Sequence, residues 1–181
     1  MHRARPPSAP RGGRPPPTFS LDAPQSAEWG PALWTILHSA AERIGSRKPA
    51  TGLLVAQRTI DAEENRLWTS LLSSLRYSLP CPLCKTHYTA YYLQHLVGDT
   101  KSVRLWLWDL HVDVNRRLGR LDGYGHEELS DVYGVPFHFS KLWGIVFDHM
   151  MRAVRMGWCA REDVQRTARI MEEMKRWYDF F

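Results

Sequence analysis

The sequence predicts an all-α protein built on a four-helix bundle. Four segments repeat apolar residues at the spacing of a helix, and each ends at a glycine or just before a proline. No segment shows the two-residue alternation of a half-buried strand, and no strand–helix–strand order is present. We expect a short extra helix beside this bundle and an added C-terminal helical pair after it.

The first two helices are delimited by residues that start or stop a helix. The first has Pro31 in its first turn, where the missing N–H costs little, and ends at Gly45. Asp61 followed by Glu64 gives the second helix a start like a capping box, and Pro80 lies just beyond its end. Apolar residues recur at helical spacing between these signals, so each helix should bury one face.

The remaining helices follow the same pattern. We expect a third helix over about residues 82–97, stopped by Gly98, and a fourth that is closed by Gly119. The fourth carries the apolar residues Val103, Trp106, Leu107, Leu110, Val114 and Leu118. Ser140 caps a further helix that ends at Gly157, and the last helix covers residues 164–177. No internal repeat relates this last pair to the first four helices, so we interpret it as an addition to the bundle.

The composition of the 181-residue chain supports a packed core and argues against two classes of protein. Apolar residues make up 44% of the chain. The net charge is +5, but residues 1–21 carry four arginines and no acid, so residues 22–181 sum to only +1. A basic surface for nucleic acid is therefore not expected. No run free of charged residues exceeds 13 positions, which is too short for a membrane-spanning helix.

Three regions are expected along the chain. Residues 1–25 form a disordered tail rich in proline and arginine, because proline removes backbone donors and blocks helix. That many prolines also argue against a mitochondrial presequence, and no apolar core of a secretory signal is present, so we expect an intracellular protein. Residues 26–136 form the bundle domain, and residues 137–181 form a C-terminal helical extension.

The clearest chemistry lies at two cysteines. Cys81 and Cys84 are separated by two residues, where the second helix has ended and the third begins. Two thiols at this spacing can close a small disulfide ring, and the free N–H groups and positive dipole end of a helix favour a thiolate. This is the arrangement for dithiol–disulfide exchange.

Other assignments of this cysteine pair compete with redox exchange. Zinc could take the pair, His87 and, from far along the chain, Cys159 as ligands, although no second closely spaced ligand pair exists. A c-type haem needs histidine directly after the second cysteine, where Lys85 stands. A thioredoxin-like site follows a strand, whereas this context is helical. The alternative that stays open is a non-enzymatic helical interaction module with a structural zinc at the pair.

Two of the predicted helices carry aromatic and polar side chains on one face. Trp34 and His38 lie four residues apart on the first helix. On the fourth, His111 and Asn115 lie four apart, Trp108 precedes them by one turn, and two arginines follow. Planar aromatics, hydrogen-bonding side chains and trailing cations suit a flat ring system with a phosphate tail. Each pair taken alone is more often core packing with a satisfied histidine.

Three ordered motifs carry a resemblance to a known family. They are Trp29-Gly30-Pro31-x-x-Trp34-x-x-Leu37-His38, then Pro80-Cys81-x-x-Cys84-x-x-His87-Tyr88, then Leu110-His111-x-x-Val114-Asn115-x-x-Leu118-Gly119. Together they resemble the Erv/ALR family of FAD-linked sulfhydryl oxidases, over about residues 26–133. The spacing and the residues after the second cysteine are most similar to the compact versions that large DNA viruses encode.

The resemblance implies a four-helix bundle that holds FAD at its mouth, with the dithiol against the isoalloxazine. Cys84 would be the sulfur that passes electrons to FAD, and Cys81 the outer sulfur that exchanges with a substrate thiol. The residues implied to line the cofactor are Gly30, Trp34, His38, Trp108, His111, Val112, Asn115, Arg117, Leu118 and Arg120. The implied reaction takes two protein thiols and dioxygen to a disulfide and hydrogen peroxide.

The chain departs from the family pattern in three ways. Val112 stands where the family usually has asparagine. An aromatic usually follows the fourth helix near the adenine, and Tyr124 and Tyr133 both could serve. No second, shuttle cysteine pair is present, because only Cys159 remains. Substrates would then reach Cys81 directly, or Cys159 would act across chains; we expect Cys159 to be a free structural cysteine.

The resemblance also implies partners and a location. The partners are thiol-bearing protein substrates, molecular oxygen and a second copy of the chain in a homodimer. Viral members of the family act in the cytoplasm of the infected host cell, which is the location we expect, with the virion as a second one. The extension at residues 137–181 carries enough apolar surface either to enlarge the dimer interface or to cover the bundle.

Overall fold

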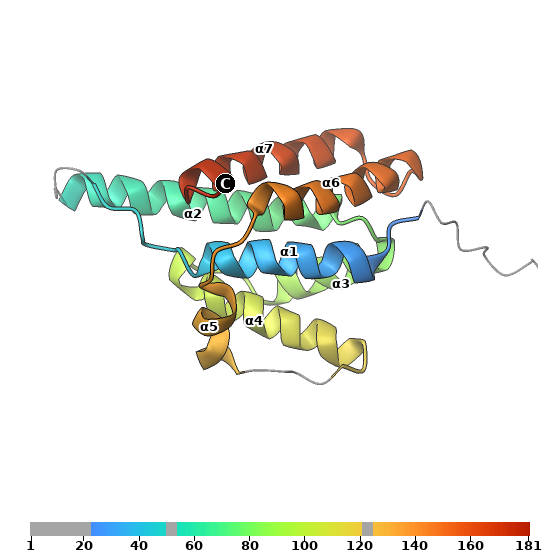
Figure 1. Cartoon of the computed structure of the whole chain (residues 1–181), viewed down its shortest axis with the longest axis horizontal. Coiled ribbons are helices and arrows are strands. Elements are labelled where there is room, and N and C mark those ends of the chain that lie inside the picture. Colours follow the sequence, from blue (N-terminus) through green and yellow to red (C-terminus); the bar gives the residue numbers. More distant parts are fainter. Residues whose placement is uncertain (1–22, 50–53, 121–124) are drawn as a thin grey trace, which may run out of the picture.

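The structure is a computed structural model that describes residues 23–49, 54–120 and 125–181. In these ranges every regular element is helical, which confirms the predicted all-α class. The elements are α1 (Ser26–Ala41), α2 (Leu54–Ser78), α3 (Pro82–Gln94), α4 (Thr100–Arg117), the 3-10 turn η1 (His126–Glu128), α5 (Leu129–Tyr133), α6 (Phe139–Arg155) and α7 (Arg161–Trp177) (Figure 1). Most of the expected tail at residues 1–25 lies outside the described residues, as does Tyr124.

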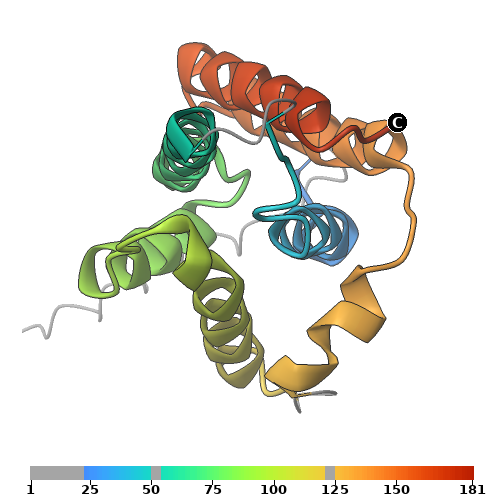
Figure 2. The same ribbon diagram turned by 90° about the vertical axis from the view of Figure 1, so that its left-hand side faces the viewer.

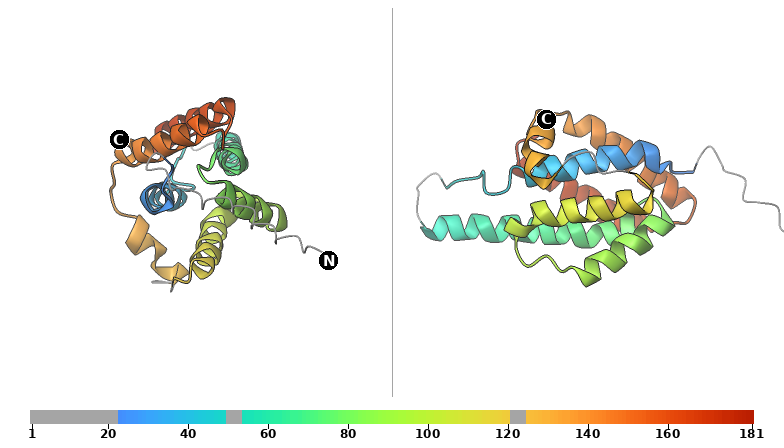
Figure 3. Two further views of the ribbon diagram at one scale, coloured as in Figure 1. Left: turned by 90° about the vertical axis from the view of Figure 1, so that its right-hand side faces the viewer. Right: turned by 90° about the horizontal axis from the view of Figure 1, so that it is seen from below.

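The helices lie in layers around α1 and α2. On one face α6 and α7 run side by side, with α6 packed on α1 and α7 packed on α2 (Figure 2). On the other face α3 packs on α2, and α4 packs on both α1 and α2, as the view from below shows (Figure 3). The short helix α5 packs on α1. The predicted bundle, the short extra helix and the added C-terminal pair are therefore all present.

The core is continuous between the bundle and the C-terminal extension. The largest fully buried side chains come from both parts: Trp68, Phe139, Ile36, Leu67, Leu71, Leu72, Leu75, Leu107, Leu129, Met150, Met171 and Met174. Burial of each such side chain contributes about 1.5–3 kcal/mol. Because the apolar faces of α6 and α7 are buried in this core, the extension covers the bundle within one chain, which is one of the two uses expected for it.

The second helix begins earlier than the sequence predicted. α2 starts at Leu54, so Asp61 lies inside the helix, where it accepts a hydrogen bond from Gln57 (2.6 Å). Glu64 is buried and does not form a capping box; it accepts a hydrogen bond from the backbone N–H of Gly45 (3.1 Å). The first turns of α2 are largely exposed and carry no apolar stripe, so the periodicity that located the helix could not reveal them.

Three other boundaries also differ from the predictions. α1 begins at Ser26, so Pro31 lies in the second turn rather than the first. α3 ends at Gln94, three residues before Val97. His138 is the N-cap of α6, and Ser140 lies inside the helix, where it accepts a hydrogen bond from Lys175 on α7 (2.8 Å). Tertiary contacts therefore decided the ends that propensity could not.

The glycine stops after three helices are confirmed. Gly45, Gly119 and Gly157 have φ angles of 73°, 66° and 71°, a left-handed conformation that favours glycine and ends a helix. Of the helices in the described ranges, none combines the length and the apolar character that crossing a bilayer requires.

Candidate functional site

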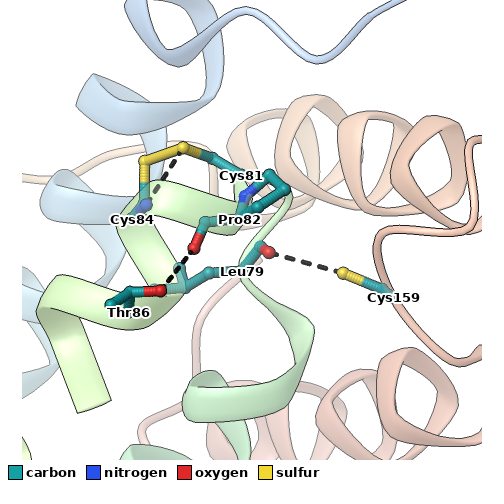
Figure 4. Close-up of a disulfide and its surroundings, with 6 residues drawn as sticks. All are labelled: Leu79, Cys81, Pro82, Cys84, Thr86 and Cys159. Atoms are coloured by element: carbon teal, nitrogen blue, oxygen red, sulfur yellow. Dashed lines mark hydrogen bonds between the residues drawn. A yellow bond between two sulfur atoms is a disulfide. The ribbon is translucent and has the colours of Figure 1, made fainter. Parts of the chain in front are cut away.

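A disulfide joins Cys81 and Cys84 at the N-terminus of α3 (Figure 4). Cys81 is the N-cap, with extended backbone, and Pro82 is the first helical residue, where its fixed φ suits the helix and no N–H is needed. The two Cα atoms are 5.1 Å apart. Both residues are half-buried and pack against the apolar core. The sequence therefore places one sulfur just before the helix and the other within its first turn.

The backbone of α3 stabilises negative charge at Cys81. The N–H of Cys84 donates a hydrogen bond to the Sγ atom of Cys81, over 3.1 Å. The N-terminus of a helix also carries a partial positive charge. A thiolate released at Cys81 would therefore be held by an amide donor and by the helix dipole, which makes Cys81 a good leaving group in disulfide exchange.

The third cysteine lies behind the disulfide and is not part of it. The thiol of Cys159 is 7% exposed and donates to the carbonyl of Leu79 over 3.4 Å (Figure 4). Burial raises the pKa of the Cys159 thiol, although the ammonium group of Lys85, 3.8 Å from the sulfur, acts in the opposite direction. A buried, protonated thiol fits the expected free structural cysteine.

The zinc ligands considered from the sequence do not come together. Within the described ranges, no group of three or more histidine, cysteine or acidic side chains could hold a metal ion. Cys81 and Cys84 share a disulfide, and Cys159 faces backbone carbonyls. The geometry therefore gives the zinc interpretation no support.

Four rings from three helices form a second feature, which we call the ring cluster: Trp34 and His38 on α1, His111 on α4 and Tyr133 on α5. The rings of Trp34 and His111 stack, with centroids 4.1 Å apart and an interplanar angle of 7°. Tyr133 stacks on His38 at 4.5 Å. Nε2 of His38 lies 3.2 Å from Nδ1 of His111. Trp34 and His38, the pair noted on the first helix, thus meet His111 of the second pair, and Tyr133 joins them.

His38 is the buried centre of the ring cluster. Burial, together with the positive fields of His111 and Arg104, lowers the pKa of His38 to about 3, and burial is the largest of these causes. The imidazole is therefore neutral at pH 7. Its Nδ1 atom is buried and has no hydrogen-bond partner among the described residues, and the same holds for Nε1 of Trp29. Such an unsatisfied atom costs about 1–3 kcal/mol, so a polar edge of a flat ligand would be stabilised here.

The α4 residues expected beside this cluster are half-buried. Trp108 makes an edge-on contact with the ring of His126 in η1, with centroids 5.5 Å apart. Val112 and Asn115 lie further along α4, three positions apart. The backbone carbonyl of Asn115 accepts the N–H of Arg120 over 2.9 Å and closes the end of the helix.

Three of the remaining predicted cofactor residues lie exposed at the end of α4, and Gly30 lies half-buried on α1. Arg117 forms an ion pair with Asp113 over 2.8 Å, Leu118 is 59% exposed, and Arg120 is exposed. Gly30 lies in the second turn of α1, and a Cβ atom added there would meet no atom within 4 Å.

Sequence reasoning missed the group that holds α5 in place. The carboxylate of Glu42, just after α1, accepts hydrogen bonds from Arg104 on α4 (2.5 Å) and from the hydroxyl of Ser130 on α5 (2.7 Å). Arg104 also donates to that hydroxyl, over 3.2 Å. This triad fixes the helix that carries Tyr133. Its three residues are far apart within a span of 89 positions, so no local sequence pattern predicts that they contact one another.

Comparison with known proteins decides the family. The sequence profile of the Erv1/Alr family matches residues 31–130, which is more than half of the chain. The chain belongs to the Erv1/Alr family. Neither the search of curated proteins nor the search of solved structures found a match. The Erv1/Alr match includes the cysteine pair and three members of the ring cluster, and it ends before Tyr133 and before the C-terminal extension.

Proposed function

We propose that this Erv1/Alr chain is an FAD-dependent sulfhydryl oxidase that forms disulfides in protein thiols, with dioxygen as acceptor and hydrogen peroxide as product. Erv1/Alr proteins are a family of FAD-linked sulfhydryl oxidases. The observation that carries the proposal is the Cys81–Cys84 disulfide at the N-terminus of α3 in a chain of that family. In a helical protein with one further cysteine, this bond is the group able to exchange with substrate thiols.

The exchange proceeds in two steps at Cys81. A substrate thiolate attacks the Sγ atom of Cys81; a bond to the substrate forms, the bond to Cys84 breaks, and Cys84 leaves as a thiolate. A second substrate thiolate then attacks the bound substrate sulfur, which forms the substrate disulfide and releases Cys81 as a thiolate. The N–H of Cys84 stabilises that leaving group. Two electrons have then moved from the substrate to the cysteine pair.

The ring cluster supplies the surface that would hold the cofactor. Trp34 and His111 are its half-buried members, and because their rings stack on each other, a planar ligand would lie against the ring face that either turns away from the other. The unpaired Nδ1 of His38 can hydrogen-bond a polar edge. Trp108, Val112 and Asn115 continue this side of α4, and Arg117 and Arg120 near its end would face a phosphate group. When bound, FAD accepts the electron pair from the cysteines and passes it to dioxygen.

Absorption spectra and peroxide assays test this proposal. The purified protein should be yellow, with flavin in a ratio near one per chain, and it should produce peroxide when dithiothreitol is added. Cys84→Ser should keep the flavin and lose turnover. A colourless protein that gains no flavin on incubation with FAD, or undiminished oxygen consumption by Cys84→Ser, would contradict the proposal.

The proposal includes a homodimer and action in the cytoplasm of an infected cell, both on the strength of the resemblance stated above. Sedimentation velocity of the full chain tests the first, since a dimer should carry twice the chain mass of 21.0 kDa. Immunofluorescence of the protein expressed from its own gene tests the second.

A further inference from the structure

A surface groove of about 690 Å³ runs along α3 from Pro82, the residue that follows the outer cysteine in the chain. Its lining begins at Pro82, the residue directly after Cys81, and follows one face of α3 as far as Leu93. Eleven residues of helix span about 16 Å. The end of α2 forms a second wall, with Arg76 and Tyr77. Neither cysteine lines the groove, but a chain lying in it would reach, at Pro82, the residue bonded to Cys81.

The third wall of the groove comes from the C-terminal extension. Ala160 and Asp163, at the start of α7, line it. Lys85 fixes this wall to α3, because its ammonium group donates to the backbone carbonyl of Trp158 in the turn before α7. The Erv1/Alr match ends at residue 130, so this wall is an addition outside the matched region. The extension therefore shapes the surface beside the redox pair as well as covering the bundle.

The charge of the groove is positive and incompletely balanced. Arg76 and Lys85 line it, and neither forms an ion pair with a carboxylate in the described part of the chain. The one acid of the lining, Asp163, lies 3.4 Å from Arg166 on its own helix. Arg76 is therefore open to an acidic ligand, while Lys85, whose ammonium group already donates to the Trp158 carbonyl, adds positive charge beside it.

Two aromatic rings position the guanidinium group of Arg76, whose Nε atom has no hydrogen-bond partner among the described residues. Its guanidinium carbon lies 5.3 Å from the ring centroids of Tyr77 and of Tyr92, and its Nε atom is buried without a hydrogen bond among the described residues. Aromatic rings on which a guanidinium lies reduce its freedom before a ligand arrives. Such a preorganised cation loses less entropy when it binds a carboxylate.

We propose that this groove docks an extended, cysteine-bearing segment of the protein substrate that carries acidic side chains beside its cysteine. About five extended residues cover the 16 Å from Pro82 to Leu93. The exposed side chains of Tyr77 (46%) and Leu93 (56%) offer apolar contact, and Arg76 binds a carboxylate, with the charge of Lys85 nearby. The inference rests on the proposed function, because the docked thiol is the one that attacks Cys81.

Matched dithiol peptides test the docking of acidic segments. Two peptides with the same cysteine spacing, one with glutamates and one with lysines beside the cysteines, are compared by oxygen consumption. We expect kcat/KM to be roughly tenfold higher for the acidic peptide, with a difference that shrinks as salt is raised. The rate with each peptide is divided by the rate of the same protein with dithiothreitol, a small dithiol whose oxidation does not depend on docking in the groove. Equal rates for the two peptides would overturn the proposal.

Two groove variants and one control separate docking from general damage. Arg76→Gln and Leu93→Ser should each reduce the ratio for the acidic peptide about threefold to tenfold. Arg58→Gln, which removes an exposed cation from the far part of α2, should leave the ratio unchanged. Leu93 is exposed, so its variant should fold even if Arg76→Gln does not. If folded Leu93→Ser and Arg76→Gln both kept the wild-type ratio of acidic-peptide rate to dithiothreitol rate, docking in this groove would be contradicted.

A binding measurement distinguishes failure of docking from failure of the oxidase function. A labelled acidic peptide with serine in place of its cysteines is titrated with the wild-type protein, and fluorescence anisotropy is recorded. Binding that Arg76→Gln weakens supports the groove even if no thiol is oxidised, in which case the proposed oxidase function alone fails. Turnover of dithiothreitol without any preference for the acidic peptide in binding rejects the groove and leaves the oxidase function standing.

Discussion

Nε2 of His38 on α1 lies 3.2 Å from Nδ1 of His111 on α4. One of these nitrogens must donate the proton and the other accept it. The contact joins α1 and α4, which carry the first and the third of the three sequence motifs, at the centre of the ring cluster. Because His38 is 1% exposed and its pKa is lowered to about 3, the contact depends on a neutral imidazole.

The first prediction concerns the pH dependence of stability. Protonation of His38 begins near pH 6.5 in the unfolded chain but only near pH 3 in the folded one, so the unfolded state binds more protons between these values. Stability contributed by His38 is therefore present above pH 6.5 and is lost as the pH falls towards 3. From pH 7 to pH 5 the loss should be about 2 kcal/mol, measured as the free energy of urea unfolding without cofactor.

Two variants check the assignment of this pH dependence to His38. His38→Gln should reduce the difference between pH 7 and pH 5 by most of that amount. His126→Gln, which removes an exposed histidine, should leave the difference as it is. An undiminished difference in His38→Gln would show that another group is responsible.

The second prediction concerns the triad that holds α5. Glu42→Ala removes the acceptor of Arg104 and Ser130, so α5 should loosen and Tyr133 should no longer be held on His38. We expect FAD affinity to fall about tenfold, which corresponds to about 1.4 kcal/mol, in a titration followed by flavin fluorescence. Glu173→Ala, which breaks the exposed ion pair with Arg66, is the matched control and should bind FAD normally. A wild-type affinity of Glu42→Ala for FAD would show that the position of α5 does not affect cofactor binding.

The third prediction concerns the buried polar contacts at the end of α7. The hydroxyl of Tyr178 accepts a hydrogen bond from Nε1 of Trp68 (2.8 Å) and donates one to Glu64 (2.9 Å). Tyr178→Phe leaves both partners buried with one bond fewer, so the free energy of unfolding should fall by about 1–3 kcal/mol. Tyr77→Phe, at a residue that is 46% exposed, should change it by less than about 0.5 kcal/mol. Equal effects of the two variants in urea unfolding would contradict this.

The fourth prediction concerns the free cysteine. Cys159→Ser keeps a donor near the carbonyl of Leu79 and removes a thiol that is buried and protonated. Oxidation of dithiothreitol should therefore stay within about twofold of the wild-type rate, in an oxygen-electrode assay. Loss of most of the activity in a folded Cys159→Ser protein would assign Cys159 a redox role that its geometry does not suggest.

The helices and the redox pair were predictable because their signals are local. Apolar spacing located the interiors of six helices, and glycines marked three of their ends correctly. Two cysteines three positions apart at the start of a helix lie within reach of each other whatever the rest of the fold does. The start of α2 was wrong because its exposed first turns have no buried face to produce a pattern.

Features that depend on contacts between residues far apart in the sequence could not be predicted from local signals. Glu64 looked like a capping residue, but the return of α7 buries it beside Tyr178, more than 100 positions away. The use of the extension also stayed open, since an apolar face on α6 packs equally well on its own bundle or on another chain. The contact of α6 with α1 shows that the extension covers its own bundle.

The sequence by itself determined the helical class, the position of the cysteine pair and the residues of α1 and α4 that form a ring cluster, since each of these follows from spacing along one or two helices. Only the tertiary structure decided that His38 is neutral and unpaired at Nδ1, that Glu42, Arg104 and Ser130 hold α5, and that α7 forms a wall of the groove beside Cys81. Burial, pKa and surface shape depend on which helices pack together, and that packing joins residues far apart in the chain.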